Sequence, residues 1–580
     1  LKQTGQPGQG RGGPDTWGEW ESALSHAEKT ISTQYTVAYI QHAPMEPRAA
    51  VAEWNDGRLS VWTGTQQPAR VHSQLCQTFR LADDQVRVMV PDTGGGFGGK
   101  QEVLIEDAAA HLTIATGRPV LLEYSREEEF VAARSRHPMT IRLKTGVKKD
   151  GTITANEMYA LSDTGANGAH ALTVTGNTGH KAMALYVGDG DYRKNPNIRF
   201  YADVVYTNRP PSGAYRGYGV PQGYWPLERH IEKITHELKI EPLEFRLKNA
   251  LRAGELHPFS TAWSEGREPK PETIETCGLE ECVRQGAAAI GWDQKFGNDE
   301  WRNFFQTALD SQKSRREKGD FAHQAKRKGI GVATVMQGTA IPYLDMGGAS
   351  IKMNDDGSFN LLVGATDIGT GSDTVLAQMA AEVLGCAVED ILVYSSDTDF
   401  TPFDKGAYAS STTYISGAAV VKAATQAADQ IKMRASVMLN NQESDDKNKH
   451  RCEPDDISLE NGNAYALDGR FVTLQEIAHN ALHHENQEQI MGIGSYMSPV
   501  SPPPFAAQFA EVTVDIETGQ VTVDKLVTAV DSGVIVNPIT ASGQVEGGMA
   551  QALGYAVCEE MVYDDSGNAR EKDFRNYHIF

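Results

Sequence analysis

The chain has 580 residues, of which 40% are apolar and 22% are charged, and its formal net charge at pH 7 is −22. Such a composition is ordinary for a folded protein with several domains. The negative charge argues against nucleic acid or an anionic membrane surface as the main partner, since both attract basic faces. No apolar run approaches the ~20 residues of a membrane-spanning helix.

The six cysteines are scattered along the chain without C-x-x-C pairs. This spacing excludes the usual zinc-ribbon and iron–sulfur motifs within the chain. Reduced, buried thiols are therefore expected, which favours a reducing, cytoplasmic compartment. No direct ligation of a metal by protein side chains is predicted.

Turn residues at four places along the chain predict β-hairpins. The first hairpin joins residues 50–54 to residues 59–63 through Asn55-Asp56-Gly57, in which Asp-Gly supplies the positive φ of a tight turn. Similar turns occur at residues 149–151, 355–357 and 517–519. Hairpins spread over the whole chain predict an α+β fold rather than a doubly wound sheet.

The polar, charged segment 253–328 divides the chain into two parts. We interpret it as a partly helical connection between a first unit, residues 1–252, and a second unit, residues 329–580. The predicted fold is thus α+β with two large mixed units.

A glycine-rich stretch, Gly94–Lys100, follows an apolar run and precedes a predicted helix at residues 108–116. Glycines let backbone N–H groups approach a ligand closely, and a helix start adds positive partial charge, so the stretch predicts a site for a phosphate-bearing cofactor. A P-loop is one alternative, but Gln101 replaces the hydroxyl residue that holds magnesium. A dinucleotide fold would suit Glu123, although no parallel βαβ series follows. A flexible turn without a ligand also stays open.

Further glycine- or hydroxyl-rich helix starts are predicted at Gly364–Gly371, Gly406–Thr413 and Gly543–Gly548. Glu546 would lie in the first turn of the last helix, where the helix dipole favours an acid without any catalytic role. Several such starts, without a nucleophilic triad or a metal-ligand cluster, suggest one large, multiply phosphorylated cofactor held by backbone donors.

Taken in order, these stretches resemble the molybdenum-binding subunit of the xanthine dehydrogenase and aldehyde oxidase family. The matching stretches are His42–Pro47, Thr65-Gln66, Gly94–Lys100, Ser212–Gly219, Gly364–Gly371, Ala409–Thr413 and Gly543–Gly554. The resemblance implies a molybdenum–molybdopterin cofactor between two α+β units, in the cytosine dinucleotide form. It also implies that both units lack part of the family's pattern, upstream of residue 1 and downstream of residue 580.

The resemblance implies roles for individual residues. Glu546 is expected to be the catalytic base, Gln66 to lie beside the oxo group of the metal, and Arg216 to orient or polarise the substrate. The metal itself is expected to be held through the pterin. The expected cofactor contacts are Gly95, Gly96, Phe97, Gly98, Gly369, Thr370, Gly371, Ala409, Ser410, Ser411, Thr412 and Gln544.

Three departures from the family's pattern narrow the expected substrate and contacts. Gln101 stands where xanthine-specific enzymes have a glutamate, which weakens a xanthine assignment. The motif Tyr215-Arg216-Gly217 lacks the cysteine of the carbon monoxide dehydrogenase branch. Thr370 replaces a glutamine of many relatives, which puts one cofactor contact in doubt.

The resemblance implies hydroxylation of an aldehyde or an electron-poor N-heteroaromatic carbon, with oxygen taken from water. Because the chain has no iron–sulfur cysteines and no flavin domain, electrons are expected to leave through partner subunits carrying [2Fe-2S] and FAD. Two alternatives stay open: a nucleotide-binding enzyme that uses Gly94–Lys100, and an apo scaffold or maturation intermediate.

Overall fold

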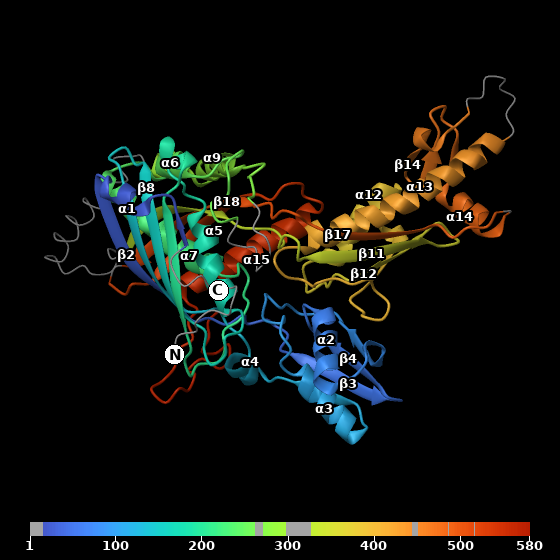
Figure 1. Cartoon of the computed structure of the whole chain (residues 1–580), viewed down its shortest axis with the longest axis horizontal. Helices are drawn as coiled ribbons and strands as arrows, with labels where there is room; N and C mark the ends of the chain where they lie inside the picture. The colour runs from blue at the N-terminus through green and yellow to red at the C-terminus, as the bar shows by residue number, and fades with distance from the viewer. Residues whose placement is uncertain (1–14, 261–270, 297–325, 443–450, 485, 516) are drawn as a thin grey trace.

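The computed structural model describes residues 15–260, 271–296, 326–442, 451–484, 486–515 and 517–580. Helices and strands are mixed along the whole described chain, which confirms the α+β prediction. Within these ranges, no helix is both long and apolar enough to cross a membrane. The sheets form several bodies that are visible side by side in Figure 1.

The first body is a five-stranded sheet in the order β1-β9-β8-β7-β2. Its longest helices, α5 (Ala171–Met183) and α7 (Val220–Leu238), pack on its strands. The other elements are β1 (Asp15–Trp17), α1 (Trp20–Ser25), β2 (Lys29–Val37), α4 (Arg126–Ala132), β7 (Met139–Val147), β8 (Ile153–Asp163), α6 (Asp191–Lys194), β9 (Ile198–Val205) and α8 (Pro242–Asn249).

A smaller sheet, ordered β5-β4-β3-β6, lies below the rest in Figure 1 and carries the glycine-rich stretch at its edge. Its elements are β3 (Ala49–Asn55), β4 (Arg58–Thr63), α2 (Pro68–Phe79), β5 (Val86–Met89), α3 (Glu106–Thr116) and β6 (Val120–Glu123). Asn55 pairs with Arg58 across the Asp56-Gly57 turn, which confirms the first predicted hairpin. The expected helix after the glycines begins at Glu106, closer to them than predicted, but still separated from Lys100 by five residues.

A third sheet, β10-β18-β19, shares its core with the first body. Phe505 and Phe509 of β18 belong to the same buried cluster as Phe200 and Phe245. The elements are α9 (Leu279–Ile290), α10 (Trp292–Lys295), β10 (Lys326–Met336), β18 (Phe505–Asp515) and β19 (Val521–Asp531). This core thus contains residues from both sides of the predicted connection at residues 253–328. The division into two units stays a prediction.

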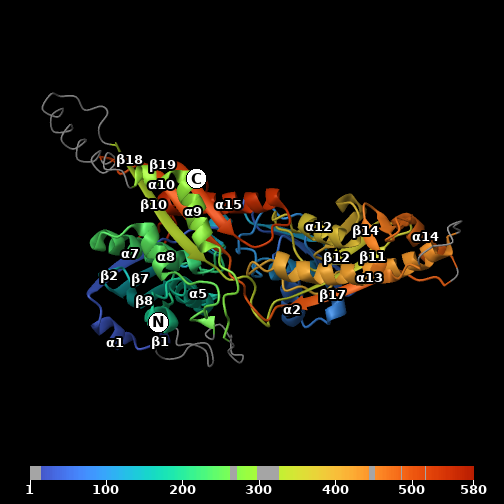
Figure 2. The same ribbon diagram turned by 90° about the horizontal axis from the view of Figure 1, so that it is seen from above.

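A fourth body contains the sheet β13-β12-β11-β17 under two long helices, with a small sheet, β14-β15-β16, at its far end (Figure 2). Its elements are β11 (Met346–Met353), β12 (Phe359–Val363), α12 (Ser372–Leu384), β13 (Ile391–Ser395), a π-helical turn (Thr412–Ser416), α13 (Gly417–Asn441), β14 (Ser458–Glu460), β15 (Asn463–Tyr465), β16 (Phe471–Thr473), α14 (Leu474–His483) and β17 (Met491–Met497). The hairpin predicted at residues 355–357 joins β11 to β12.

The last helix, α15 (Pro538–Val557), begins beside α12 and extends from there toward the first and third sheets in both views. Asn537 caps its first turn and donates from its side-chain amide to Gln378 of α12 (3.1 Å). The prediction that this helix starts at Gly543 is wrong, because Asn537 and Pro538 already provide a cap and a first-turn proline. Glu546 therefore lies in the third turn, where the helix dipole no longer explains it.

Candidate cofactor and active site

Gln66 joins two segments that are far apart in the sequence. Its side chain is buried, and its Oε1 accepts hydrogen bonds from the N–H groups of Gly98 (2.9 Å) and Lys100 (3.2 Å). Its Nε2 donates to the carbonyl oxygen of Ala407 (2.7 Å). One amide side chain thus fixes the glycine-rich stretch against the segment that precedes the π-helical turn.

In the backbone of Gly94–Lys100, amides near both ends donate hydrogen bonds within the chain, whereas two amides in the middle do not. Gly95 and Gly98 have φ of 92° and 99°, a region that glycine adopts freely. The N–H of Gly94 donates to Glu46 (2.7 Å). By contrast, the N–H groups of Gly96 and Phe97 meet no acceptor in the part of the chain that the structure describes, although Gly96 is buried. Two adjacent unsatisfied amides are a ready donor pair for a ligand.

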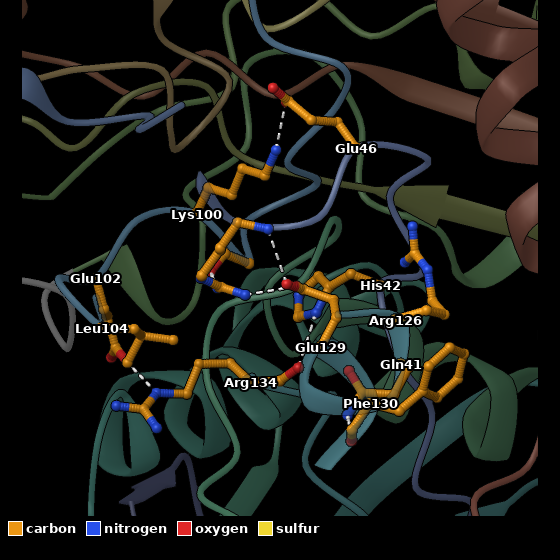
Figure 3. A network of polar contacts seen from close by, with 12 residues as sticks. Gln41, His42, Glu46, Lys100, Glu102, Leu104, Arg126, Glu129, Phe130 and Arg134 are labelled. Atoms are coloured by element: carbon orange, nitrogen blue, oxygen red, sulfur yellow. Dashed lines mark hydrogen bonds and ion pairs between the residues drawn. The ribbon is translucent and has the colours of Figure 1, made fainter. Parts of the chain in front are cut away.

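The structure does not support the P-loop alternative. Lys100 is buried and its ammonium donates to Glu46 (2.6 Å; Figure 3), so it does not face the Gly96 and Phe97 amides as a phosphate-binding lysine would. The start of α3 is occupied as well, because the Glu106 carboxylate accepts from the N–H groups of Leu104 and Ile105. The donors of this loop are backbone amides of the loop itself and not a helix N-terminus.

Arg216 brings the glycine loop and α15 together. Its N–H donates to the carbonyl oxygen of Phe97 (2.8 Å). Its guanidinium donates to the carbonyl oxygen of Gln544 (2.6 Å) and to the side-chain oxygens of Gln544 (3.2 Å) and Gln551 (3.3 Å). Burial lowers the pKa of Arg216, yet a guanidinium remains protonated in proteins. The structure thus places three predicted site residues, Phe97, Arg216 and Gln544, in one connected group.

Two residues without a predicted role support this group. His42 is buried, its ring nitrogens lie 3.0 and 2.6 Å from the carbonyl oxygens of Arg134 and Ala214, and its ring stacks on Tyr215 (4.2 Å between ring centres). Figure 3 shows His42 within the polar network beside the loop. Burial lowers the pKa of His42 to about 3. Arg136 lies 3.9 Å from the centre of the Tyr215 ring and donates to the carbonyl oxygen of Arg216 (2.8 Å).

At the second glycine-rich helix start, a side chain of the chain itself accepts from the backbone N–H groups, and the cofactor contacts expected there stay a prediction. The Asp367 side chain accepts from the N–H groups of all three predicted contacts, Gly369 (2.9 Å), Thr370 (2.9 Å) and Gly371 (3.2 Å). These donors are therefore satisfied within the loop. Other polar atoms of this loop and of the first turn of α12 are buried without a hydrogen-bond partner among the described residues: Thr366 Oγ1, Ser372 Oγ and Asp373 Oδ1. Such atoms fit a polar cofactor better than a solvent-facing turn.

The segment Ala409–Thr412 lies next to Gln66 in a strained conformation. Ala409 and Ser410 have φ of 52° and 55°, which costs on the order of 1 kcal/mol or more per non-glycine residue. The Ala409 carbonyl oxygen accepts from the N–H of Ala340 (2.8 Å), and just before the segment the N–H of Ala407 donates to the carbonyl oxygen of Gln66 (2.8 Å). Strain of this kind concentrates at functional sites.

Glu546 stands apart from the group formed by Phe97, Arg216 and Gln544. Its side chain is exposed on α15, and its carboxylate accepts from the Ser542 hydroxyl (3.1 Å). No hydrogen bond or ion pair among the described residues joins it to Gln66 or Arg216. Its role as a base stays a prediction.

Within the described residues, a backbone donor pair without an acceptor, the bridging amide of Gln66 and hydroxyl groups without a partner are the features expected of a site for a large polar cofactor. Two models of the molybdopterin cofactor-binding domain match the chain, over residues 11–250 and 305–580. The chain is 33% identical over 571 residues to the xanthine dehydrogenase molybdenum-binding subunit of Escherichia coli O157:H7, covering 97% of this chain and 69% of that protein.

Further similarities agree with these matches. The chain is 34% identical over 563 residues to the "probable hypoxanthine oxidase XdhD" of Escherichia coli K12, and spans about half of that relative's length (97% of this chain, 54% of the relative). The fold matches quinoline 2-oxidoreductase from Pseudomonas putida 86 with a TM-score of 0.82 at 24% identity, covering 98% of this chain and 70% of that one. The chain therefore belongs to the family of molybdopterin-binding large subunits that includes xanthine dehydrogenase, which confirms the resemblance.

Proposed function

We propose that this chain is the cofactor-binding subunit of a hydroxylase that acts on an aldehyde or an electron-poor N-heteroaromatic carbon. The observation that carries the proposal is the pair of unsatisfied amides at Gly96 and Phe97, held beside Gln66 and Arg216. When bound, the molybdopterin cofactor supplies the redox centre that takes up two electrons. The balanced reaction converts R–H and water to R–OH, two protons and two electrons.

The residues of the chain have distinct roles in this proposal. The N–H groups of Gly96 and Phe97 donate to acceptor atoms of the cofactor, and the Gln66 side chain fixes the loop that presents them. Arg216 is held by α15 in one orientation, so its charge can meet negative charge that develops on the substrate. Glu546 is the predicted proton acceptor.

Partners and cofactor form belong to the same proposal. The relatives include proteins named as subunits, among them the molybdenum-binding subunit of xanthine dehydrogenase. We propose that the two electrons leave through an iron–sulfur subunit and an FAD subunit. The cofactor is proposed to be the cytosine dinucleotide form, and the compartment to be the cytoplasm.

Elemental analysis of the protein purified with its partner subunits tests the proposal. We expect close to one molybdenum per chain, release of cytidine monophosphate on acid hydrolysis, and incorporation of ¹⁸O from labelled water during turnover of benzaldehyde or quinoline. A folded, metal-free protein that still binds its partners would contradict the proposal and favour a scaffold.

The same preparation carrying Glu546→Gln tests the predicted proton acceptor. If Glu546 is the base, turnover should fall about 100-fold or more while molybdenum content is retained, because general-base catalysis contributes at least that factor. Glu382, an acid in α12 outside the site contacts described above, gives the control Glu382→Gln, which should leave turnover unchanged. Full activity of Glu546→Gln would assign the proton acceptor to another group and leave the family membership intact.

A further inference from the structure

Three side chains that can ligate a metal ion converge in the smaller body of the molecule, at the end of α2 (Figure 1). They are His72 and Cys76 of α2 and Asp83 of the short 3-10 turn that precedes β5. One ligand atom of each, a ring nitrogen, the thiol sulfur and a carboxylate oxygen, lies within 4.8 Å of the other two. Because this group contains a single cysteine, the absence of C-x-x-C pairs from the sequence does not exclude it.

The end of α2 turns the chain back so that Asp83 meets the helix. His72 and Cys76 are four positions apart, so their side chains are neighbours on one face of α2. The helix then ends at Arg80, whose φ of 55° is left-handed, and the N–H of Leu81 donates to the carbonyl oxygen of Cys76 (3.0 Å). This reversal adds a carboxylate oxygen to the nitrogen and the sulfur of the helix.

The surroundings of His72 determine which ring nitrogen can bind a metal ion. Its Nε2 lies 3.0 Å from the backbone carbonyl oxygen of Asp83. A carbonyl oxygen can only accept, so Nε2 carries the proton and Nδ1 of the neutral ring keeps its lone pair. Nδ1 is the nitrogen that lies 4.0 Å from Cys76 Sγ. Histidine ligands of metal ions typically donate from the other ring nitrogen in this way, which fixes the orientation of the ring.

The distances and the ligand types suit a zinc ion. Zinc bonds of roughly 2.0–2.3 Å place the ligand atoms of a tetrahedron about 3.3–3.8 Å apart, so a small movement of two side chains closes the gap between His72 Nδ1 and Cys76 Sγ. A thiolate together with an imidazole selects zinc over calcium and magnesium, which prefer oxygen ligands.

The site is accessible to an ion from solvent. Cys76 is buried, whereas Asp83 is exposed, so the carboxylate borders the water that can fill a fourth coordination position. The Cys76 thiol lies 3.8 Å from the carbonyl oxygen of Ala82, to which it donates. Zinc binding exchanges this weak hydrogen bond for a zinc–sulfur bond, and the thiol proton passes to solvent.

We propose that His72, Cys76 and Asp83 form a zinc site that joins the end of α2 to the turn before β5. The α2 helix begins two residues after Gln66, and β5 leads toward Gly94–Lys100. Zinc therefore stabilises, from the opposite ends of both elements, the body that carries these two parts of the cofactor site. This inference does not depend on the proposed hydroxylase activity.

Zinc titration of the purified full chain, first stripped with a chelator, tests the site. The variants are Cys76→Ser and Asp83→Asn, and the matched controls are Cys558→Ser, at an exposed cysteine, and Asp84→Asn, at the adjacent exposed acid. We expect one zinc ion per chain to bind in a calorimetric step that both controls retain. Both variants should weaken this step by more than about 10-fold, since loss of a group that only supports a ligand already costs that factor. Zinc at about 100 times its dissociation constant should raise the unfolding temperature of the wild type and of the controls alone.

Cobalt distinguishes this site from a histidine pair elsewhere in the chain. His479 and His483 lie one turn apart in α14, with ring centres 5.0 Å apart, and can bind zinc in the same titration. Only a thiolate ligand gives cobalt a strong sulfur-to-metal charge-transfer band in the near ultraviolet. We expect this band in the difference spectrum of the wild type and of Cys558→Ser, and its loss from Cys76→Ser.

The exposed position of Asp83 keeps the test decisive if Cys76→Ser does not fold. Asp83→Asn changes no buried group, so a folded Asp83→Asn protein with weakened zinc binding supports the site by itself. Unchanged zinc binding in Asp83→Asn would overturn the inference, as would a wild-type cobalt spectrum without the charge-transfer band. Calcium binding as tight as zinc binding would overturn it too.

Discussion

The two glycine-rich stretches, Gly94–Lys100 and Gly364–Gly371, look alike in sequence but differ in the acceptors that their backbone N–H groups meet. In the first, flanking amides bind Glu46 and Gln66 while those of Gly96 and Phe97 have no acceptor within the described residues. In the second, Asp367 accepts from three consecutive amides. The first stretch is therefore prepared for an external acceptor, whereas the second is completed by its own side chain.

The difference shows what a glycine pattern can and cannot predict. Glycine allows a backbone to approach a ligand, but an acceptor from the chain can take the same donors first. In the second stretch and the first turn of α12, the polar groups without a partner among the described residues are side-chain atoms, those of Thr366, Ser372 and Asp373. We expect the first stretch to bind the cofactor through backbone N–H groups and the second through side chains.

Substitution of Gly96 should give the largest effect. A Cβ at this position would lie 2.7 Å from Gln66 Oε1, so Gly96→Ala forces apart the loop and the amide that holds it. We expect molybdenum per chain to fall about tenfold or more, since overpacking of this kind costs roughly 1–3 kcal/mol. The control is Gly331→Ala in β10, where a Cβ would meet nothing within 4 Å. Full loading of Gly96→Ala would remove this loop from the cofactor site.

Arg216→Lys tests whether the residue that links the two sides of the site acts on the substrate. Lysine keeps the charge but cannot make the forked contacts to Gln544 and Gln551, so its ammonium is no longer fixed. We expect kcat/KM to fall about 100-fold with molybdenum retained, as for loss of one fixed charge-stabilising group. Arg229→Lys, on the exposed side of α7, is the matched control. Loss of molybdenum together with activity would instead indicate that Arg216 stabilises the position of α15 and does not act on the substrate.

Much of the local structure could be predicted because it depends on neighbours in sequence. The turns at Asp56-Gly57 and at residues 355–357 follow from the backbone preferences of their own residues. Asn537 and Pro538 also carry a local start signal for α15, so the misplaced start of that helix reflects an overlooked cap.

Other features depend on contacts between distant segments. No spacing rule shows that Gln66 reaches Ala407 across 341 positions, or that Arg136 supports Arg216 from 80 positions away. Lys181 illustrates the same limit, because a lysine in an amphipathic helix is expected at the surface and only the packing of α5 against the segment around Gly338 buries it.

Asp367→Ala should give the smallest effect and the sharpest contrast between the two glycine-rich stretches. Removing the carboxylate releases three backbone amides just before α12, and loss of such a cap costs about 1–2 kcal/mol. We expect the free energy of unfolding of the body that contains Gly364–Gly371 to fall by that amount, as measured by urea denaturation and by local amide exchange in α12. Molybdenum content should stay near the wild-type value. Asp373→Ala, in the first turn of α12, should instead reduce loading, because Asp373 Oδ1 has no hydrogen-bond partner among the described residues. If Asp367→Ala bound the cofactor more tightly, the released amides would be donors after all, and the two stretches would work in the same way.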